Sequence, residues 1–502
     1  MTTLLQRKAG VREWAALVVL MLPVLLVSID NTVLSFALPY IARDLQPSGT
    51  AQLWMVDAYP LVLAGLLVAM GNLGDRYGRR RMLMIGTVGF GVVSAFAAFV
   101  PNAELLILAR VLLGFFGAML MPSTLSLLRS TFTDRRQRRL AIAIWAAGFS
   151  AGSAVGPVVG GVLLEHFWWG SVFLLAVPVL LPLLVLAPLL ITESKDPNPG
   201  PFDAVSILLS MATLVPIVFA IKTVATDGLG IVPIVLVIVG LIAGVAFVRR
   251  MLSRENPMFD VRLFRVRAFS GAVIVNLVSV FSLVGFLFFL TQHLQLVSGL
   301  APMDAAIALV PGTVVIVIAG LAAVPLVRIV RPGYVMAAGL TLSLIAYTSI
   351  AIIGSGATVT SLVIAFCVLG AGIGAAETLS NDLIIASVPA DKAGAASGVS
   401  ETAYELGAVL GTAVLGSILT AFYRSSIVIP DGLSPADAAS ARETLGAAVE
   451  ISTTLPGSTG DALLASARHA FDSGVAVTAW TAAALMAVAI VVTLVTLRKV
   501  RG

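Results

Sequence analysis

Apolar runs long enough to cross a membrane recur along almost the whole chain, and this pattern constrains the fold more than any other feature. Because an α-helix rises ~1.5 Å per residue, roughly 20 apolar residues span the ~30 Å hydrocarbon core of a bilayer. The composition agrees, since 59% of the residues are hydrophobic, 11% are charged and the mean hydropathy is +1.04. A membrane β-barrel would instead show alternating segments of about ten residues. The sequence therefore predicts an all-α membrane protein and excludes a water-soluble globule.

The breaks between these runs predict fourteen spans. The spans lie near residues 14–40, 51–73, 82–100, 105–128, 140–164, 170–191, 204–224, 230–248, 270–295, 303–327, 334–353, 359–387, 397–422 and 475–497. An even number places both termini on one side of the membrane, and the ends and loops of that side carry most of the 31 Lys and Arg residues. Since basic loops stay in the cytoplasm, we expect both termini there, with the first run retained as an uncleaved span.

The longest loop between predicted spans covers residues 423–474 and falls on the outer side. Its sequence predicts two short amphipathic helices, one opening at Ser434 and Pro435 and one near Asp461. A loop of this length is long for a simple connection. Two interpretations remain open, a lid over the transport path and a plain cover.

The glycine pattern repeats within the chain. The glycines of the fifth predicted span recur in the thirteenth at a nearly constant offset, with Gly152, Gly156 and Gly161 matching Gly407, Gly411 and Gly416. A similar match joins the fourth span to the twelfth. Internal repeats of this kind are typical of transporters built from two halves. We therefore expect a six-helix half at residues 1–200, two inserted helices at 201–250, and a second six-helix half at 251–502.

The loop after the second span combines glycines, one acid and several arginines. It contains Gly71, Gly74, Asp75, Arg76, Gly78 and Arg79. Glycines let helix ends approach closely, and Asp75 can cap a helix or pair with an arginine. A tight basic turn that only sets topology would be the simpler explanation, but it would not need Asp75. The loop resembles the signature loop of the major facilitator superfamily, which implies the fold of that family and a gating role; the second half has no good copy of it.

Three further stretches narrow the resemblance. The first span contains Asp30 within an Ile-Asp-Asn-Thr-Val segment, and the fourth contains Arg110 ahead of a glycine pair. The fifth span carries small residues at helical spacing, which let helices pack closely, and a proline that bends the axis: Gly148, Gly152, Gly156, Pro157 and Gly161. Ordinary small-residue packing would explain the glycines alone. Together the stretches resemble the 14-span drug:proton antiporters over nearly the whole chain.

Charged residues inside the spans are the candidate functional residues, because a charge in hydrocarbon costs at least a few kcal/mol. Distances along the helices place Asp30, Asp57 and Arg110 toward the outer half, where the three could share one site. We predict that Asp30 accepts the transported proton, that Arg110 tunes its proton affinity, and that Asp57 contacts the cation or binds a second proton. The alternatives are a purely structural Asp30–Arg110 pair and a solvated Asp57.

A second set of acids is predicted toward the cytoplasmic half. Glu401 and Glu405 share one helix face, and their segment resembles the acidic span of quaternary-ammonium and dye pumps, which implies contacts to a cationic substrate. Glu377 joins this prediction, whereas Asp382 fits a solvated helix end. The aromatic rings predicted to stack on a flat cation are Phe149, Phe286 and Tyr404.

These features predict a proton-coupled antiporter that exports lipophilic organic cations by alternating access. No nucleotide-binding loop, metal cluster or cofactor motif is present in the sequence, so we expect the proton gradient to drive transport and no enzyme activity. The basic residues lie between spans rather than on one soluble face, which argues against nucleic acid. We expect a monomer in the inner membrane of a bacterium, with no indication of an envelope partner protein. The alternatives are an exporter of an endogenous lipid or metabolite, and a non-transporting membrane enzyme.

Overall fold

The computed structural model describes residues 9–195, 203–254, 261–388 and 393–498, and within these ranges the chain is helical without strands. Thirteen helices in the described part are long and apolar enough to cross a membrane. One further long helix, α5 (Arg135–His166), has 32 residues and a shorter apolar stretch at Val155–His166, and it lies where the fifth span was predicted. The predicted all-α fold is confirmed, and the number of fourteen spans stays a prediction.

The helices follow the predicted order of two halves separated by a helix pair. The first half contains α1 (Val11–Leu45), α2 (Gly49–Tyr77), α3 (Arg79–Ala97), α4 (Ala103–Thr131), α5, α6 (Ser171–Leu174) and α7 (Ala176–Leu190), and the pair is α8 (Ala204–Asp227) and α9 (Ile231–Ser253). The second half contains η1 (Val261–Arg265), α10 (Arg267–Gln292), η2 (His293–Val297), α11 (Pro302–Leu326), α12 (Pro332–Ile353), η3 (Gly354–Gly356), α13 (Val359–Ala386), α14 (Ala393–Leu410), η5 (Gly411–Gly416), α15 (Ser417–Ser426), α16 (Pro435–Glu443), α17 (Leu445–Thr454) and α18 (Gly457–Leu497). The exact domain boundaries stay a prediction.

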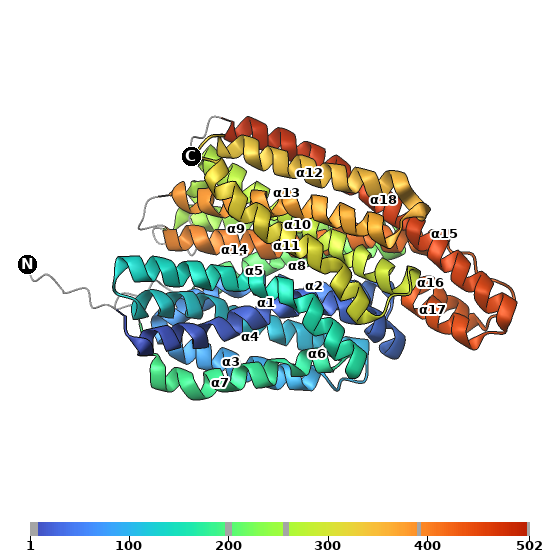
Figure 1. Ribbon diagram of the computed structural model, residues 1–502, viewed down its shortest axis with the longest axis horizontal. Coiled ribbons are helices and arrows are strands. Elements are labelled where there is room, and N and C mark those ends of the chain that lie inside the picture. The colour runs from blue at the N-terminus through green and yellow to red at the C-terminus, as the bar shows by residue number, and fades with distance from the viewer. Residues whose placement is uncertain (1–8, 196–202, 255–260, 389–392, 499–502) are drawn as a thin grey trace, which may run out of the picture.

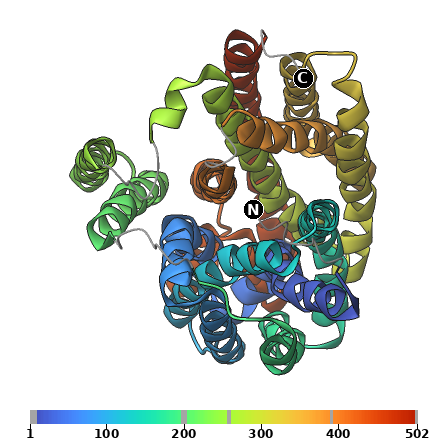
Figure 2. The same ribbon diagram turned by 90° about the vertical axis from the view of Figure 1, so that its left-hand side faces the viewer.

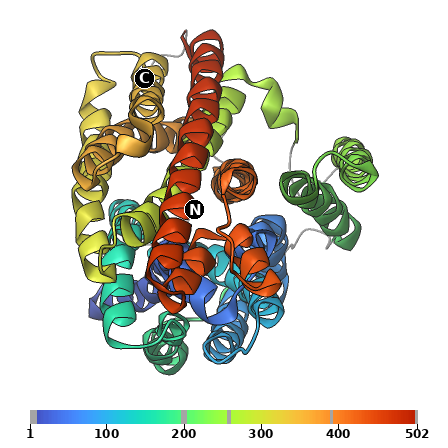
Figure 3. The same ribbon diagram turned by 90° about the vertical axis from the view of Figure 1, so that its right-hand side faces the viewer.

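The two halves lie side by side, and the helices of both halves run roughly parallel to the long axis of the molecule. In Figure 1, α1, α3, α4, α6 and α7 form the lower part, and α12, α13 and α18 form the upper part. Helix α1 begins and α18 ends at one end of the bundle, while α15 to α17 form the opposite end. Figures 2 and 3 show α8 and α9, in green, at the side of the bundle. The start of the first long helix and the end of the last one therefore lie at the same end of the bundle, as an even number of spans predicts.

Polar side chains at the loop boundaries define where several spans begin. Ser48 Oγ accepts a hydrogen bond from Ala51 N at the start of α2, and Asn102 Oδ1 accepts one from Leu105 N at the start of α4. Asp134 Oδ1 starts α5 in the same way. Such caps satisfy backbone N–H groups that have no partner within the helix. These local signals fix the helix starts before any packing between helices is considered.

Close packing of the glycine-bearing helix α5 connects it to both halves. A methyl group at Gly152 would lie 2.6 Å from Ser28 Cβ of α1, so only glycine fits this contact. The same helix carries Gly148 and Gly156, which also face α1, and Pro157, which lies inside it. Near the end of α5, a methyl group at Gly161 would lie 3.0 Å from Met303 Cα of α11. Helix α5 therefore packs within the first half and reaches the second half at its end.

Helix α14 and its continuation η5 repeat this arrangement in the second half. A methyl group at Gly407 would lie 2.5 Å from Leu277 O of α10, which corresponds to the α5–α1 contact. At Gly416, a methyl group would lie 2.7 Å from Leu53 Cδ2 of α2, across the boundary between the halves. The glycine repeat in the sequence thus marks equivalent packing positions in the two halves.

The segment between the last two spans differs from its prediction in two respects. The helix predicted to open at Ser434 and Pro435 is present as α16, and Ser434 Oγ caps it. The helix predicted near Asp461 is not a separate element, because α18 begins at Gly457 and continues for 41 residues to the end of the last span. A buried stripe at helical spacing, which includes Leu463 and Ala467, explains this continuity. Helix α17 was not predicted.

Candidate functional site

Asp30 of α1 and Arg110 of α4 form a buried ion pair. Arg110 Nη1 donates to Asp30 Oδ2 at 2.6 Å, and the two side chains are 2% and 9% exposed. Two further contacts hold the arginine, since Nε donates to Met55 O at 3.0 Å and the guanidinium lies 4.6 Å from the Tyr59 ring centroid. The predicted proximity of Asp30 and Arg110 is confirmed. Because Arg110 has three contacts, its position does not depend on Asp30 alone.

Asp57 of α2 has a partner that the sequence did not reveal. Lys222 Nζ of α8 lies 2.8 Å from Asp57 Oδ2, and both side chains are at most 1% exposed. The ammonium also lies 4.0 Å from the Trp54 ring centroid, and the hydroxyl of Thr412 lies within reach of Asp57. The interpretation of Asp57 as solvated is therefore wrong. Arg110 is close enough to act on Asp57 electrostatically, but it does not form its ion pair.

Lys222 could have been noticed as a functional residue from one signal. It is the only charged residue within the apolar span Ala204–Val224. A lysine at such a position either extends to the membrane surface or pairs inside the bundle. Sequence spacing cannot distinguish these two outcomes. Packing of α8 against α2 decides in favour of the pair.

Glu405 of α14 links the two sets of acids that the sequence placed at different depths. Its side chain is 4% exposed, and Oε2 has no hydrogen-bond partner within the described residues. It lies close enough to Arg110 and Asp30 to interact with both electrostatically. Glu405 therefore belongs with the Asp30–Arg110 pair as well as with the acids of the second half.

Glu377 of α13 and Glu401 of α14 extend this group of acids. Both are half-buried, and the two are close enough to repel each other. The Tyr404 ring is within electrostatic range of both and of Glu405. Asp382 is exposed and stands apart, as predicted for a helix-end residue. Within the described residues, neither Glu377, Glu401 nor Glu405 forms an ion pair with a basic side chain.

The predicted aromatic contacts differ in accessibility. Phe286 is fully buried, and its ring stacks on Phe366 at 6.0 Å and packs against Phe289 at 4.8 Å and Tyr347 at 5.5 Å. In this conformation it packs the core of the second half, so its contact with a substrate stays a prediction. Phe149 lies in α5, and its side chain is outside the described part of the structure. Of the two rings whose side chains are described, Tyr404 is the one placed beside the acids.

The signature-like loop connects α2 to α3 and packs against α4. Asp75 Oδ1 accepts from Arg79 Nε at 2.8 Å, one helical turn away, so the acid pairs with an arginine of its own loop. Gly71 and Gly74 face Pro122 and Ser123 of α4 at ordinary contact distance, while Arg76 is exposed. Alanine would fit at both positions, so the close approach of helix ends expected at these two glycines is not seen.

Glu193 completes this loop and was missed in the sequence. Its carboxylate accepts hydrogen bonds from Arg80 N at 2.9 Å and Arg81 N at 3.1 Å, and so caps the start of α3. Gly78 has φ +114°, and a methyl group there would lie 2.7 Å from the Glu193 carboxyl carbon. Glycine is therefore required both for the backbone conformation and for the approach of Glu193. The only signal in the sequence is an acid at the end of the sixth span, which is not specific.

The outer segment 423–474 contacts both halves. Gly49 N at the start of α2 donates to Glu443 Oε2 of α16 at 3.0 Å, and Arg43 Nε of α1 lies 2.7 Å from Glu450 Oε2 of α17. Arg424 of α15 pairs with the same Glu443 at 3.2 Å. Helices of the second half thus bind the first half at the end away from the termini.

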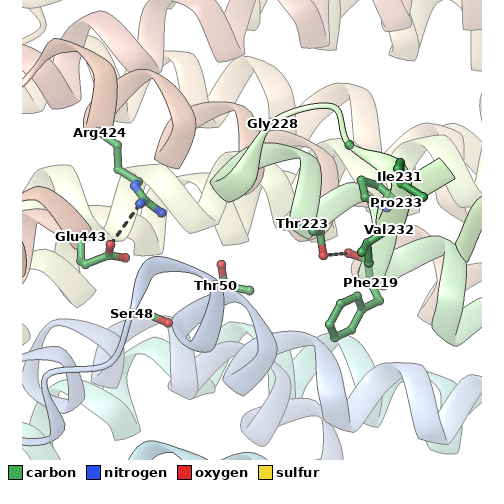
Figure 4. A pocket seen from close by; sticks show the side chains of 11 residues that line it. Ser48, Thr50, Phe219, Thr223, Gly228, Ile231, Val232, Pro233, Arg424 and Glu443 are labelled. Atoms are coloured by element: carbon green, nitrogen blue, oxygen red, sulfur yellow. Dashed lines mark hydrogen bonds and ion pairs between the residues drawn. The ribbon is translucent and has the colours of Figure 1, made fainter. Parts of the chain in front are cut away.

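A cavity of about 640 Å³ lies at the same end, beside the inserted helix pair (Figure 4). Phe219, Thr223 and Ile231 line it from α8 and α9, and Arg424 and Glu443 line it from α15 and α16. The acids within the spans, namely Asp30, Asp57, Glu377, Glu401 and Glu405, do not line it, so it is distinct from the candidate site. In the described ranges, no three His, Cys, Asp or Glu side chains gather to hold a metal ion.

Comparison with known proteins relates this arrangement to one family. The model of the Major Facilitator Superfamily matches residues 20–412. The multidrug efflux pump LfrA of Mycolicibacterium smegmatis is 57% identical over 488 residues, with 97% of each chain covered. The methyl viologen resistance protein SmvA of Salmonella typhimurium is 36% identical, with 92% of this chain and 93% of that protein covered.

A solved structure confirms the likeness of fold. The bacterial homologue of the human lysosomal transporter Spinster, in an inward-facing and unoccupied conformation, aligns with a TM-score of 0.67. The alignment covers 98% of both chains at 17% identity. At this identity the likeness shows the fold alone.

Proposed function

The chain belongs to the major facilitator superfamily, and from this premise we propose that it exports lipophilic organic cations such as dyes, quaternary ammonium biocides and drugs in exchange for protons. It is a multi-pass membrane transporter and not an enzyme. Two relatives are named for multidrug efflux and for methyl viologen resistance, which supports export of foreign compounds. The proposal names the charge of the substrate and the driving ion.

One observation carries the choice of a cationic substrate. Glu377, Glu401 and Glu405 lie within electrostatic range of one another or of Tyr404, and no basic side chain of the described residues forms an ion pair with them. Unpaired carboxylates inside a membrane bundle are costly unless a positive charge or a proton compensates them. Nearby Arg110 is already engaged with Asp30. This group of acids would therefore bind a lipophilic cation, or protons in its absence.

Competition for these acids is sufficient to couple the two fluxes. Protons that enter from outside neutralise the carboxylates and displace the cation, and rocking of the two halves exposes the site alternately to each side. Asp30 is the proposed proton acceptor, with Arg110 adjusting its affinity through their direct contact. Inter-half contacts at the end that carries α16 and α17 support a conformation closed at that end.

The placement in the cell follows from the distribution of charge. We propose that the arginine-rich end, which carries the loop around Asp75, faces the cytoplasm of a bacterium and that both termini lie there. The α16–α17 end then faces outward. The pump acts as a monomer in the lipid bilayer and needs neither cofactor nor nucleic acid. Gly71 to Arg79 and the α5 glycines would serve as gating and packing elements between the moving helices.

The test is efflux of ethidium from cells that express the protein, with and without a protonophore. Proton coupling predicts that efflux stops when the gradient is dissipated and that a pH gradient alone drives ethidium transport in everted vesicles. The double variant Glu401→Gln, Glu405→Gln removes two carboxylates of the group; it should be inserted normally and should lose most of the efflux. Asp382→Gln, at an exposed helix end, serves as the control and should retain it.

Two other outcomes would change the assignment. Ethidium efflux that persists with a protonophore would refute proton coupling. If neither ethidium nor methyl viologen is exported, the cationic substrate is wrong, and the same vesicles should be tested with labelled lipids and endogenous metabolites, which are the alternative cargo.

A further inference from the structure

The strongest unexplained feature is the fully buried pair between Asp57 and Lys222. Burying two charges costs more than their mutual attraction returns unless further contacts satisfy them. Here the ammonium also lies over Trp54, and the carboxylate lies near Thr412. The pair joins three elements, namely α2 of the first half, the inserted helix α8, and the π-helical segment η5 of the second half. A hydrophobic pair of the same size would hold α8 in place without the free-energy cost of removing two charges from water.

The pair lies at the seam between the two halves. A small buried cluster next to it contains Leu61 of α2, Val218 of α8 and Val409 of α14. Thr412 belongs to η5, and π-helical segments inside α-helices occur often at functional sites. Helix α8 otherwise exposes much of its apolar surface. Its one charged side chain within the span is thus directed to the seam that must rearrange when the halves move.

We propose that Lys222 is a positioning residue for cation export: its ammonium serves as a tethered counter-cation that keeps Asp57 ionised and unavailable to protons and to the substrate. The inserted helix thereby makes Asp57 unavailable to protons and to the cation. Protons and the cation then compete for Asp30 and the glutamates of the second half alone. Asp57 is then not a substrate or proton contact in this conformation, in contrast to its predicted role. The inference rests on the proposed function only for its consequence on transport.

The surrounding charges support this division of roles. Lys222 faces Asp57 from α8, Arg110 faces it from α4, and Thr412 approaches it from η5. Arg110 is in direct contact with Asp30 and not with Asp57, so it does not replace Lys222. Glu405 of the second half acts on Arg110 and Asp30. Asp57 is consequently the one buried acid that pairs with a lysine within the described part of the spans.

The first test does not require transport. Dicyclohexylcarbodiimide enters membranes and adds to protonated carboxyl groups, which then form a stable N-acylurea, whereas ionised carboxylates react poorly. In vesicles at pH 7, mass spectrometry of the wild type should find modification among Glu377, Glu401 and Glu405 and none at Asp57. In Lys222→Met, Asp57 should become modified. Thr223→Val, the next residue of α8, is the control and should leave Asp57 unmodified.

The wild-type measurement alone can overturn the proposal. If Asp57 is modified as extensively as Glu405, Lys222 does not keep it ionised, and this conclusion holds even if Lys222→Met fails to insert. If Lys222→Met inserts and Asp57 stays unmodified, the proposal is equally refuted.

The second test measures ethidium efflux against pH at a fixed pH gradient. Lys222→Met should show an added pH-dependent step that the wild type lacks, because Asp57 now exchanges protons. The double variant Asp57→Asn, Lys222→Met has no carboxyl at position 57 and should lose this step. A Lys222→Met profile identical to the wild-type profile would show that the pair only holds α8 against α2, and would refute the proposed role of Lys222. Absence of efflux from the wild type would instead refute the proposed function and leave the labelling result unaffected.

Discussion

Replacing Asp30 by asparagine removes the negative charge from its pair with Arg110 while keeping the size of the side chain and one acceptor oxygen. The arginine should remain in place, because Nε still donates to Met55 O at 3.0 Å and the guanidinium still lies over the Tyr59 ring. The variant therefore tests the charge of Asp30 and its ability to exchange a proton, with little change in packing.

The size of the effect follows from the 2.6 Å contact. A hydrogen bond to a charged group contributes about 1.5–3 kcal/mol, and one between neutral groups about 0.5–1.5 kcal/mol. The hydrogen bond itself loses the difference, on the order of 1–1.5 kcal/mol. Leaving the buried guanidinium of Arg110 without its counter-charge raises the total cost to about 3–5 kcal/mol. Insertion of the variant is therefore measured directly, as the amount of protein in the membrane. Loss of proton exchange at Asp30, in contrast, should remove coupling altogether.

The assay is protonophore-sensitive ethidium efflux, normalised to the amount of protein in the membrane. Asp30→Asn should reduce this efflux at least tenfold, to near the background of cells without the protein. Asp30→Glu keeps a carboxyl group and should retain part of it. Wild-type efflux by Asp30→Asn at equal membrane levels would show that Asp30 only holds α1 to α4, and would refute its role in coupling.

Three further changes test the structure itself through thermal unfolding in detergent. Glu193→Ala removes the cap of α3 and should destabilise the protein by about 1–2 kcal/mol, whereas Glu104→Ala, at an exposed position of another helix start, should change the unfolding midpoint little. Gly374→Ala should cost about 1–3 kcal/mol because its methyl group would overlap the α11 backbone, whereas Gly91→Ala meets nothing within 4 Å and should be neutral; equal midpoints would contradict the packing. The pKa of Asp203 is held below its ordinary value of 3.8 by hydrogen bonds from the arginine partner on α9, so its stabilising contribution is complete above that value and is lost as the pH falls through the lowered pKa. Asp203→Asn should therefore lower the unfolding midpoint at pH 7, and a difference from wild type that fails to shrink below pH 3.8 would contradict this assignment.

Much of the fold could be predicted because it depends on local composition. The number and order of the spans follow from apolar length, and the start of α16 follows from Ser434 and Pro435. The glycine repeat predicted equivalent helices, and the structure places Gly152 and Gly407 in equivalent contacts. The start of α18 was misplaced because a helix can continue beyond the membrane without any change in the local sequence signal.

The sequence by itself determined that this protein is an all-helical membrane protein, that its glycine pattern repeats between two sets of helices, and that acids lie within its apolar helices. These properties arise from side-chain hydropathy and helical spacing, which act over a few residues. Only the tertiary structure decided which charges are neutralised, because those contacts join distant parts of the chain. Asp57 receives Lys222 from an inserted helix, and α3 receives Glu193 from 113 residues away. Glu377, Glu401 and Glu405 form no such ion pair within the described residues, since the packing of their helices brings no free cation to them.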